Sequence, residues 1–221
     1  IDLYQLHWPE RITNTFGKRD FDSSVNDKWE ENFENVLFNL KTIISSGKVR
    51  QIGISNENPW AFMKYLELSK KKLPKTITIQ NPYSLLNRLF EIGNSEICMR
   101  EDVGLLAYSP LGFGVLSGKY LNGNMPKDSR LKLFPNLSRF SGENSMKATS
   151  MYYNISKKYN LSLTQMALSF VNSRPFVTSN IIGATKLNQL KENIESINID
   201  LSEDALKEIN EVHKLIPNPA P

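Results

Sequence analysis

The stretch GKVRQIGISNENPWAFMKYLELSK, residues 47–70, contains the unit from which the fold can be deduced. Its first part, Val49–Ile54, is an apolar run rich in β-branched residues and predicts a strand. Asn58 and Pro59 then supply the N-cap and the first-turn proline of a helix that extends to about Lys72. A strand followed directly by a helix is the repeating unit of proteins built on a parallel sheet.

The same alternation extends in both directions from this unit. Five apolar runs predict strands, at Ile1–Leu6, Val49–Ile54, Thr76–Ile79, Val103–Tyr108 and Thr178–Gly183. Segments with helical spacing lie between and after them, at 29–44, 58–72, 90–100, 162–171, 186–197 and 202–216. We find no internal repeat, low-complexity tract or linker that divides the chain. We therefore expect a single α/β domain over residues 1–221, built on a parallel sheet.

The composition is that of a globular protein and argues against several classes. The 221 residues are 40% hydrophobic and 23% charged, which is enough for one sizeable core. The sequence has neither an apolar run of about 18 residues, the length that spans a membrane, nor a secretory signal pattern. The 27 basic residues are scattered among 23 acidic ones. We expect a cytoplasmic protein with no membrane or nucleic-acid partner, and an anionic small ligand remains compatible with the charge.

Side chains that could carry reactive or metal chemistry are sparse. Cys98 is the single cysteine and has no Cys or His cluster near it, so we expect a buried thiol and no metal site. Of the two histidines, His213 lies next to Val212 in the last helix and is expected to be packed or on the surface. His7 ends the first strand just before Trp8, where an imidazole can donate to a carbonyl oxygen.

Polar residues follow all five predicted strands. They are His7, then Ser55 and Asn56, then Gln80 and Asn81, then Tyr108 and Ser109, and finally Gly183, Ala184 and Thr185. Parallel α/β sheets and barrels bind their ligands beyond the C-terminal ends of the strands. An ordinary turn or cap explains any one of these residues better than a site does. Five polar strand ends that converge on one mouth nevertheless favour a ligand site.

Two segments have features of a phosphate-binding site. The last strand leads through Gly183–Lys186 into a helix, whose first N–H groups can hold a phosphate, although many helix caps look alike. The run Leu111–Lys119 contains three glycines, which permit close approach of a pyrophosphate, and ends in a cation. It lacks the glycine spacing of the dinucleotide-binding fingerprint, and a flexible turn is the alternative.

Residues 121–144 form the longest stretch without a clear period. Loops of this length inside a compact domain tend to be functional or disordered. Its basic residues are Lys127, Arg130, Lys132 and Arg139, accompanied by Phe134 and Phe140. Because arginine binds phosphate and stacks on aromatic rings, we expect a loop that covers a cofactor, with a solvated basic loop as the alternative.

These residues together resemble the aldo-keto reductases, most closely the bacterial Tas-type branch of that family. The matching segments are LYQLHWP at 3–9, GKVRQIGISN at 47–56, TIQNPYSLLNR at 78–88, AYSPLGFGVLSGKYLNG at 107–123 and GATKLNQLKEN at 183–193. The resemblance implies a (β/α)8 TIM barrel, of which this chain would form about the last five β/α units and a C-terminal helix. It also implies an NADP(H)-dependent oxidoreductase that reduces aldehydes and ketones to alcohols.

The resemblance also assigns roles to individual residues. His7 matches the catalytic histidine, which orients and polarises the substrate carbonyl. Ser55, Asn56 and Gln80 match contacts to the nicotinamide carboxamide, and Tyr108 matches the residue that stacks on the nicotinamide ring. The matches at the pyrophosphate are Ser109, Pro110, Leu111, Gly112 and Lys119. Those at the adenosine and 2′-phosphate are Arg130, Thr185, Gln189, Glu192 and Asn193, with Gly183 at the neighbouring helix start. This basic set favours NADP over NAD.

Only one member of the family's catalytic tetrad has a match here. The tetrad consists of Asp, Tyr, Lys and His, and the tyrosine is the general acid. Only His7 matches, and the sequence opens abruptly at Ile1 inside a strand-like run. We therefore expect an N-terminally truncated barrel with open strand edges, which aggregates, associates through those edges or folds only loosely. Without the general acid we expect no meaningful turnover.

A nucleotide-sensing binding or regulatory protein is the second hypothesis. It is suggested by similarity to the potassium-channel beta subunits, which share the barrel and the SGKY run at 117–120. Such a protein binds the cofactor while it serves a partner, with little or no turnover. In the first hypothesis the partner is a small-molecule carbonyl substrate.

Overall fold

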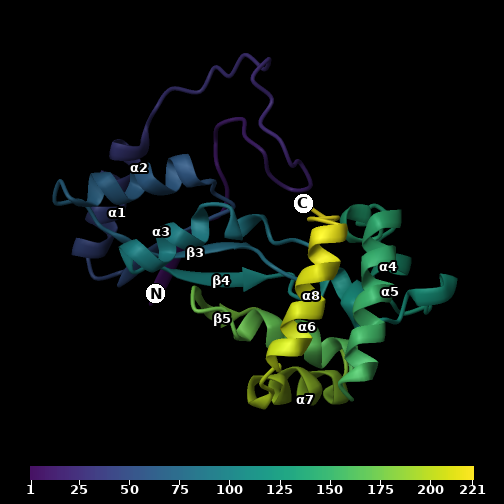
Figure 1. The fold of residues 1–221 in the computed structure, drawn as a ribbon. Coiled ribbons are helices and arrows are strands. Elements are labelled where there is room, and N and C mark those ends of the chain that lie inside the picture. The colour runs from purple at the N-terminus through teal and green to yellow at the C-terminus, as the bar shows by residue number, and fades with distance from the viewer. The chain divides into compact units, whose positions relative to one another are not determined.

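The computed structural model describes residues 1–221, which form five strands and eight α-helices (Figure 1). The strands follow one another in the sheet in the order β1-β2-β3-β4-β5, and β2 pairs in parallel with both β1 and β3. This arrangement confirms the predicted α/β fold. The chain forms two compact units, one made of Ile1–Asn81 with Phe90–Leu106 and the other of Pro82–Leu89 with Ala107–Pro221. None of the helices is both long and apolar enough to cross a bilayer.

The first unit contains three strands, three helices and the start of a fourth strand. The strands are β1 (Leu3–Leu6), β2 (Gln51–Ser55), β3 (Thr76–Pro82) and β4 (Gly104–Tyr108), and the helices are α1 (Phe33–Ser45), α2 (Pro59–Ser69) and α3 (Asn94–Glu101). A short 3-10 turn, η1 (Leu89–Glu91), precedes α3. Helix α2 contacts both α1 and α3. Residues 7–32 form the long purple connection from β1 to α1 in Figure 1.

The sheet of the first unit has one apolar and one polar face. Ile54 pairs with Ile79, and both side chains are fully buried. Gly53 pairs with Gln5 on one side and Thr78 on the other. Neighbouring residues of a strand point to opposite faces, so these three lie on the face opposite the isoleucines. Burial of each isoleucine stabilises the unit by about 1.5–3 kcal/mol, and the opposite face carries polar groups toward the strand ends.

Helix α1 ends where the sequence predicts and begins later. Gly47 follows the helix at φ 74°, a left-handed conformation that suits glycine. The helix starts at Phe33 with Asn32 as N-cap, so Trp29 belongs to the preceding connection. The Trp29 ring packs edge-on against Phe33 at 5.3 Å between centroids. Trp29 continues the apolar spacing of the helix in the sequence because its ring packs against the helix, although its backbone is not helical.

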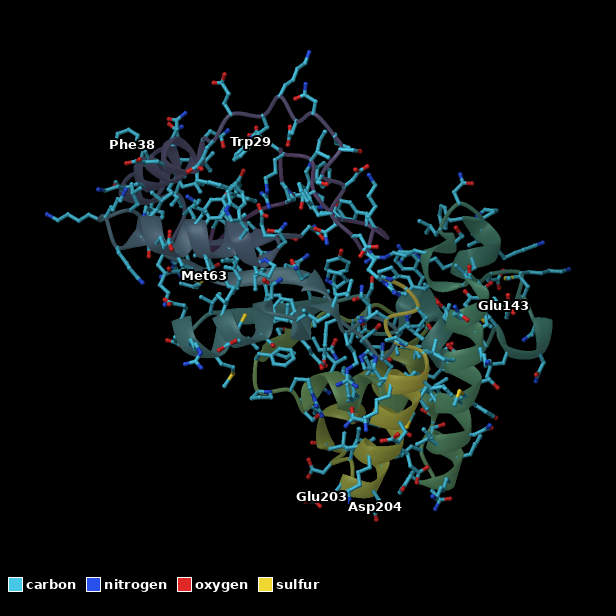
Figure 2. All side chains as sticks on the ribbon, turned by 45° about the horizontal axis from the view of Figure 1, so that its top comes forward. Trp29, Phe38, Met63, Glu143, Glu203 and Asp204 are labelled. Atoms are coloured by element: carbon cyan, nitrogen blue, oxygen red, sulfur yellow. The ribbon has the colours of Figure 1, made fainter.

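Side-chain caps begin three helices, each at the first residue of a predicted helical segment. They are Asn58 for α2, Ser162 with Gln165 in a capping box for α6 (Leu163–Asn172), and Ser202 for α8 (Glu203–Leu215). Each cap satisfies a backbone N–H that the helix leaves without a partner. Glu203 and Asp204 lie in the first turn of α8, where the helix dipole favours acids (Figure 2).

The second unit is mostly helical. After the end of β4 come η2 (Gly112–Ser117), η3 (Leu121–Gly123), α4 (Arg130–Leu133), η4 (Ser138–Phe140), α5 (Glu143–Lys158), α6, β5 (Val177–Asn180), α7 (Leu187–Glu195), η5 (Ser196–Asn198) and α8. Helix α5 contacts α6 and α8, and α6 contacts α7. The yellow α8 runs beside the green α5 in Figure 1. The largest fully buried side chains of the second unit include Phe140, Tyr152 and Phe170.

Helix α5 is an element that the sequence analysis missed. Its buried face mixes Tyr152 and Ile155 with the hydroxyl residues Ser145, Thr149 and Ser156. The Thr149 hydroxyl donates to the carbonyl oxygen of Ser145 at 2.7 Å, so this polar group is satisfied inside the helix. Because the apolar stripe is interrupted, the 3.6-residue period is weak in the sequence.

Residues 121–144 are more ordered than their composition indicates. They contain η3, α4 and η4, and α5 begins at Glu143. The Tyr120 hydroxyl accepts a hydrogen bond from the Leu131 N–H at 3.3 Å, and Leu131 is buried. Short helices of this kind leave no periodic signal in the sequence, because each is only about one turn long.

Strand β3 is longer than predicted. It continues to Pro82, so Gln80 and Asn81 lie inside the strand and not beyond it. The physical reason is that the backbone ladder persists: the Asn56 N–H donates to the carbonyl oxygen of Gln80 at 3.1 Å.

Strand β5 is shorter than predicted. It ends at Asn180, so Gly183–Thr185 form a loop that leads to α7 and not a strand end. The Ile181 N–H still donates to the carbonyl oxygen of Ala107 at 2.8 Å. Residues 183–185 make no further backbone hydrogen bond to the neighbouring strand.

Candidate functional site

The strand-end residues of the first unit form one hydrogen-bonded cluster. Ser55 Oγ donates to the carbonyl oxygen of Gln80 at 2.6 Å, and the Asn56 backbone N–H donates to the same oxygen. The Asn56 side-chain nitrogen donates to Ser55 Oγ at 3.0 Å and to the carbonyl oxygen of His7 at 2.8 Å. The structure thus brings together four residues that the sequence predicts for the site.

Asn56 is the residue that joins these strand ends. It leaves β2 in a left-handed conformation, φ 58°, which asparagine tolerates better than most side chains do. Both N–H bonds of its amide are used inside the protein, and the residue is 8% exposed. Its first role is therefore to hold the ends of β1, β2 and β3 in place.

His7 is exposed at the end of β1. Its ring lies 4.1 Å from the Trp8 ring, centroid to centroid, with an interplanar angle of 37°. Trp8 itself is 57% exposed and meets the edge of Phe16 at 6.3 Å. The imidazole is therefore accessible to a ligand and is flanked by an aromatic wall.

A polar layer supports this cluster on the same face of the sheet. Gln5 Nε2 donates to Gln80 Oε1 at 2.7 Å, and Thr78 Oγ1 donates to Gln5 Oε1 at 3.2 Å. Gly53 makes room for these side chains, since a Cβ there would lie 2.2 Å from Thr78 Oγ1. The sequence analysis did not single out Gln5, Gly53 or Thr78. Their signal is the alternation of polar or small residues with apolar ones along three strands.

A cavity of about 280 Å³ opens beside His7 and Trp8. Trp29, Phe33 and Tyr65 form an aromatic part of its wall. Burial raises the pKa of the Tyr65 hydroxyl, and the nearby Glu57 carboxylate raises it further. The volume is close to the lower end for small-ligand pockets, about 300 Å³.

A buried ion pair next to the cavity was also missed by the sequence analysis. Arg11 Nη2 lies 2.6 Å from Glu57 Oε2, and Arg11 Nη1 donates to Glu57 Oε1 at 3.1 Å. The two side chains are 8% and 5% exposed. Burial raises the pKa of Glu57, while the hydrogen bonds and charge of Arg11 oppose that shift. No local sequence pattern indicates such a pair, because 46 positions separate its two residues.

The second unit contains the predicted pyrophosphate segment in a tightly turned backbone. Ser109, Gly112, Phe113, Gly114 and Gly118 all have positive φ, at 55°, 51°, 55°, 88° and 78°. A Cβ at Gly112 would lie 3.0 Å from the buried ring of Phe140. The glycines are thus required by backbone conformation and close packing. This segment is an ordered turn, with Pro110 and Gly112 buried and Leu111 partly exposed.

Lys119 lies over this turn. A Cβ at Gly114 would come within 2.8 Å of Lys119 Nζ, so the ammonium group sits directly against the glycine. It also lies 5.2 Å from the centroid of the Tyr120 ring. A cation is therefore held against the glycine backbone of the turn, which is an arrangement suited to an anion.

Two arginines lie on aromatic rings of the same unit. Arg130 Cζ is 4.3 Å from the centroid of Phe113, and Phe113 meets Phe140 edge-on at 4.8 Å. Burial raises the pKa of Tyr108, whereas the charge and hydrogen bond of Arg139 oppose the shift. Arg139 lies in the basic loop of the sequence analysis but was not among its predicted site residues. Its place beside Tyr108 makes it a candidate.

Four of the predicted adenosine contacts lie in α7 or just before it, and Arg130 lies in α4. Gln189 Oε1 accepts from the Thr185 N–H at 3.1 Å and from the Thr185 hydroxyl at 3.2 Å. Asn193 is buried and donates to the carbonyl oxygen of Gly183 at 3.4 Å, and Glu192 accepts from the hydroxyl that caps α6 at 2.5 Å. Local structure thus explains Glu192 and Asn193, while Thr185 remains exposed to a ligand.

The residues of the second unit fit a phosphate-bearing ligand. Lys119 and Arg130 supply cations, and the glycines of the positive-φ turn at 112–118 carry no side chains of their own. No group of three or more His, Cys, Asp or Glu side chains in the structure is arranged to hold a metal ion. A cofactor with phosphates is therefore the kind of group that this donor set suits.

Comparison with known proteins gives the class to which this fold and these residues belong. Residues 1–214 match the model of the aldo/keto reductase family. The chain is 49% identical to Protein tas of Escherichia coli (strain K12) over 222 residues, which are 100% of this chain and 64% of that protein. It is 37% identical to an aldo-keto reductase of Babesia bovis over 228 residues, 96% of this chain and 80% of the relative. It is 35% identical to L-glyceraldehyde 3-phosphate reductase of Escherichia coli (strain K12) over 166 residues, 72% of this chain and 47% of the relative.

The chain belongs to the aldo/keto reductase family. This confirms the family resemblance, including its Tas-type branch. The parallel five-stranded α/β fold agrees with consecutive units of the family's barrel. The chain spans 64% of the length of Protein tas, so the activity of a whole protein of this kind is treated as a proposal below.

Proposed function

We propose that this chain is the part of an NADP(H)-dependent carbonyl reductase that holds the cofactor and supplies the catalytic histidine. The observation that carries the proposal is the cluster of His7, Ser55, Asn56 and Gln80 at the strand ends of an aldo/keto reductase family member. The proposed substrate is a small aldehyde or ketone. The name of the related L-glyceraldehyde 3-phosphate reductase, which describes reduction of an aldehyde, supports that substrate class.

The proposed chemistry assigns a task to each group of the first unit. Bound NADPH would supply a hydride to the carbonyl carbon, and the alkoxide that forms would take a proton from a general acid, which in the family is a tyrosine. The His7 imidazole would donate a hydrogen bond to the carbonyl oxygen and stabilise the negative charge that develops there. The Ser55 hydroxyl and the Gln80 side chain would hold the nicotinamide carboxamide, and the Gln5 amide keeps Gln80 in place. The Trp8 ring lies 4.1 Å from the His7 ring and would narrow the directions from which a substrate can approach.

The second unit is proposed to bind the phosphates and to select NADP. Tyr108 stacks on the nicotinamide ring, Lys119 meets the pyrophosphate, and Arg130 meets the 2′-phosphate. Arg130 is suited to this task because its guanidinium is exposed and rests on the Phe113 ring. A planar guanidinium can bind a phosphate through two hydrogen bonds, which NAD cannot use for lack of that phosphate.

Substitution of Arg130 tests this assignment. Arg130→Ala is compared with Lys127→Ala, which removes another exposed cation of the same loop. We expect Arg130→Ala to weaken NADPH binding about tenfold, equivalent to about 1.4 kcal/mol, and to leave NADH binding unchanged. Equal effects of the two substitutions on NADPH would contradict the proposed role of Arg130.

A nucleotide-sensing role with little turnover is the second candidate. It is favoured by the SGKY run at 117–120, which this chain shares with the potassium-channel beta subunits. Such a role predicts cofactor binding with little or no reduction. The test is NADPH oxidation by the purified chain with a panel of aldehydes and ketones. Binding without oxidation favours cofactor binding as the chain's own activity, whereas NADPH oxidation coupled to carbonyl reduction would contradict this.

A further inference from the structure

Three consecutive residues after β2 fasten the segment that follows β1. The pairs are Asn56 Nδ2 with the His7 carbonyl oxygen at 2.8 Å, Glu57 with Arg11 at 2.6 and 3.1 Å, and Asn58 Nδ2 with Thr13 Oγ1 at 2.7 Å. The three tethers run in the same order along both segments. Residues 7–13 therefore cannot shift along residues 56–58 without the loss of all three.

The middle tether is the strongest of the three. Arg11 and Glu57 form a bidentate pair, which fixes orientation as well as distance. The Arg11 guanidinium also lies 5.2 Å from the centroid of Trp60 and 5.9 Å from that of Phe33. Both members of the pair are almost completely buried. The guanidinium is thus held on its faces by rings and at its edge by a carboxylate.

The turn that carries Glu57 is itself fixed. The carbonyl oxygen of Glu57 accepts hydrogen bonds from Asn81 Nδ2 at 2.9 Å and from Asn94 Nδ2 at 3.2 Å. Asn58 caps α2 directly after it. Glu57 is therefore an anchored point, to which the segment that contains Arg11 is fastened.

His7 forms the first tether through its carbonyl oxygen, and Trp8 lies between the first tether and the second. Neither ring is held by burial, since His7 is exposed and Trp8 is 57% exposed. Their contact, with centroids 4.1 Å apart and planes tilted by 37°, must therefore depend on the path of the backbone from residue 7 to residue 11. A buried ion pair adds little stability compared with an apolar pair of similar volume, so its contribution here is to geometry.

We propose that Arg11 and Glu57 are positioning residues, whose ion pair sets the turn after β1 so that the His7 imidazole and the Trp8 indole face a carbonyl substrate together. The inference rests on the proposed function for the role of His7. It concerns two residues that touch neither the cofactor nor the reacting atoms. Loss of the pair should change the surroundings of His7 even when the chain stays folded.

The His7 signal in NMR spectra tests this directly. In a His213→Gln background, His7 is the remaining histidine. The neighbouring Trp8 ring shifts the NMR signals of the His7 imidazole protons. We expect Arg11→Met to abolish that shift, and Glu57→Gln to reduce it. The double substitution Arg11→Met with Glu57→Leu removes both charges, so it should recover thermal stability without recovering the shift.

Two results would overturn the proposal. One is an unchanged His7 signal in a folded Arg11→Met or Glu57→Gln chain, and the other is full recovery of the signal in the double variant. Arg50→Met is the matched control, because its ion pair with Asp2 is exposed and should leave the His7 signal as it is. The spectra are recorded without cofactor, so failure of the chain to bind NADPH would count against the proposed function and not against this inference.

Discussion

The side-chain amide of Asn56 donates to the carbonyl oxygen of His7 at 2.8 Å, while the backbone of Asn56 adopts a left-handed conformation at φ 58°. Asn56→Gly removes the hydrogen bonds and keeps the conformation accessible, whereas Asn56→Ala also strains the backbone. We expect both variants to be less stable by about 1–3 kcal/mol, with alanine the worse by about 1 kcal/mol. Denaturant unfolding measures both differences, and an alanine variant as stable as the parent would show that neither term matters.

The polar layer under the site predicts a steric limit at Gly53. Gly53→Ala would place Cβ 2.2 Å from Thr78 Oγ1 and 3.0 Å from the Thr78 carbonyl oxygen, so we expect a loss of about 1–3 kcal/mol or more. Gly183→Ala is the control, because a Cβ at Gly183 meets nothing within 4 Å. Its thermal midpoint should match that of the parent chain. Equal midpoints for the two variants would refute the close packing around Gly53.

Cys98 is expected to be chemically inert in the folded chain. Burial raises the pKa of its thiol to about 12, so at pH 8 roughly one molecule in 10⁴ carries the thiolate. A thiol reagent should therefore react slowly with the native chain and rapidly after denaturation. Rapid reaction of the native chain at pH 8 would mean that Cys98 is more exposed than the 3% seen here.

Helix α7 buries one polar residue and exposes its apolar ones. Asn193 is buried, whereas the apolar residues on the helix and just after it are exposed, namely Leu187, Leu190, Ile194 and Ile197. Exposed apolar stripes of this kind favour association. We expect the purified chain to self-associate, and Leu190→Lys with Ile194→Lys to lower its mass in light scattering. Phe38→Lys, on the outer face of α1 (Figure 2), is the control. A chain that is monomeric without any substitution would disprove this expectation.

The parts of the fold that local chemistry determines could be predicted from the sequence. Asn58, Ser162 and Ser202 begin helices because each caps a backbone N–H three residues on, which is a short-range effect. The end of β5 could not be predicted, because apolar residues continue to Ile182 after the ladder has ended. Helix α5 was missed because hydroxyl residues occupy part of its buried face.

The candidate site divides in the same way. Ser55 and Asn56 were found because they directly follow an apolar run, and the structure joins them to His7 and Gln80. Arg11 and Glu57 were not found, since each looks like an ordinary surface residue until the fold brings them together across 46 positions. Sequence patterns therefore indicate the residues that face a ligand. The residues that hold those side chains in position become visible only from the long-range packing in the structure.

Calorimetric titration of the purified 221-residue chain with NADPH, and separately with NADH, measures directly whether the chain binds the proposed cofactor. We expect saturable binding of NADPH at one site per chain, with NADH bound about tenfold more weakly because Arg130 lacks a 2′-phosphate to contact. Absence of NADPH binding, or equal affinity for the two cofactors, would contradict it.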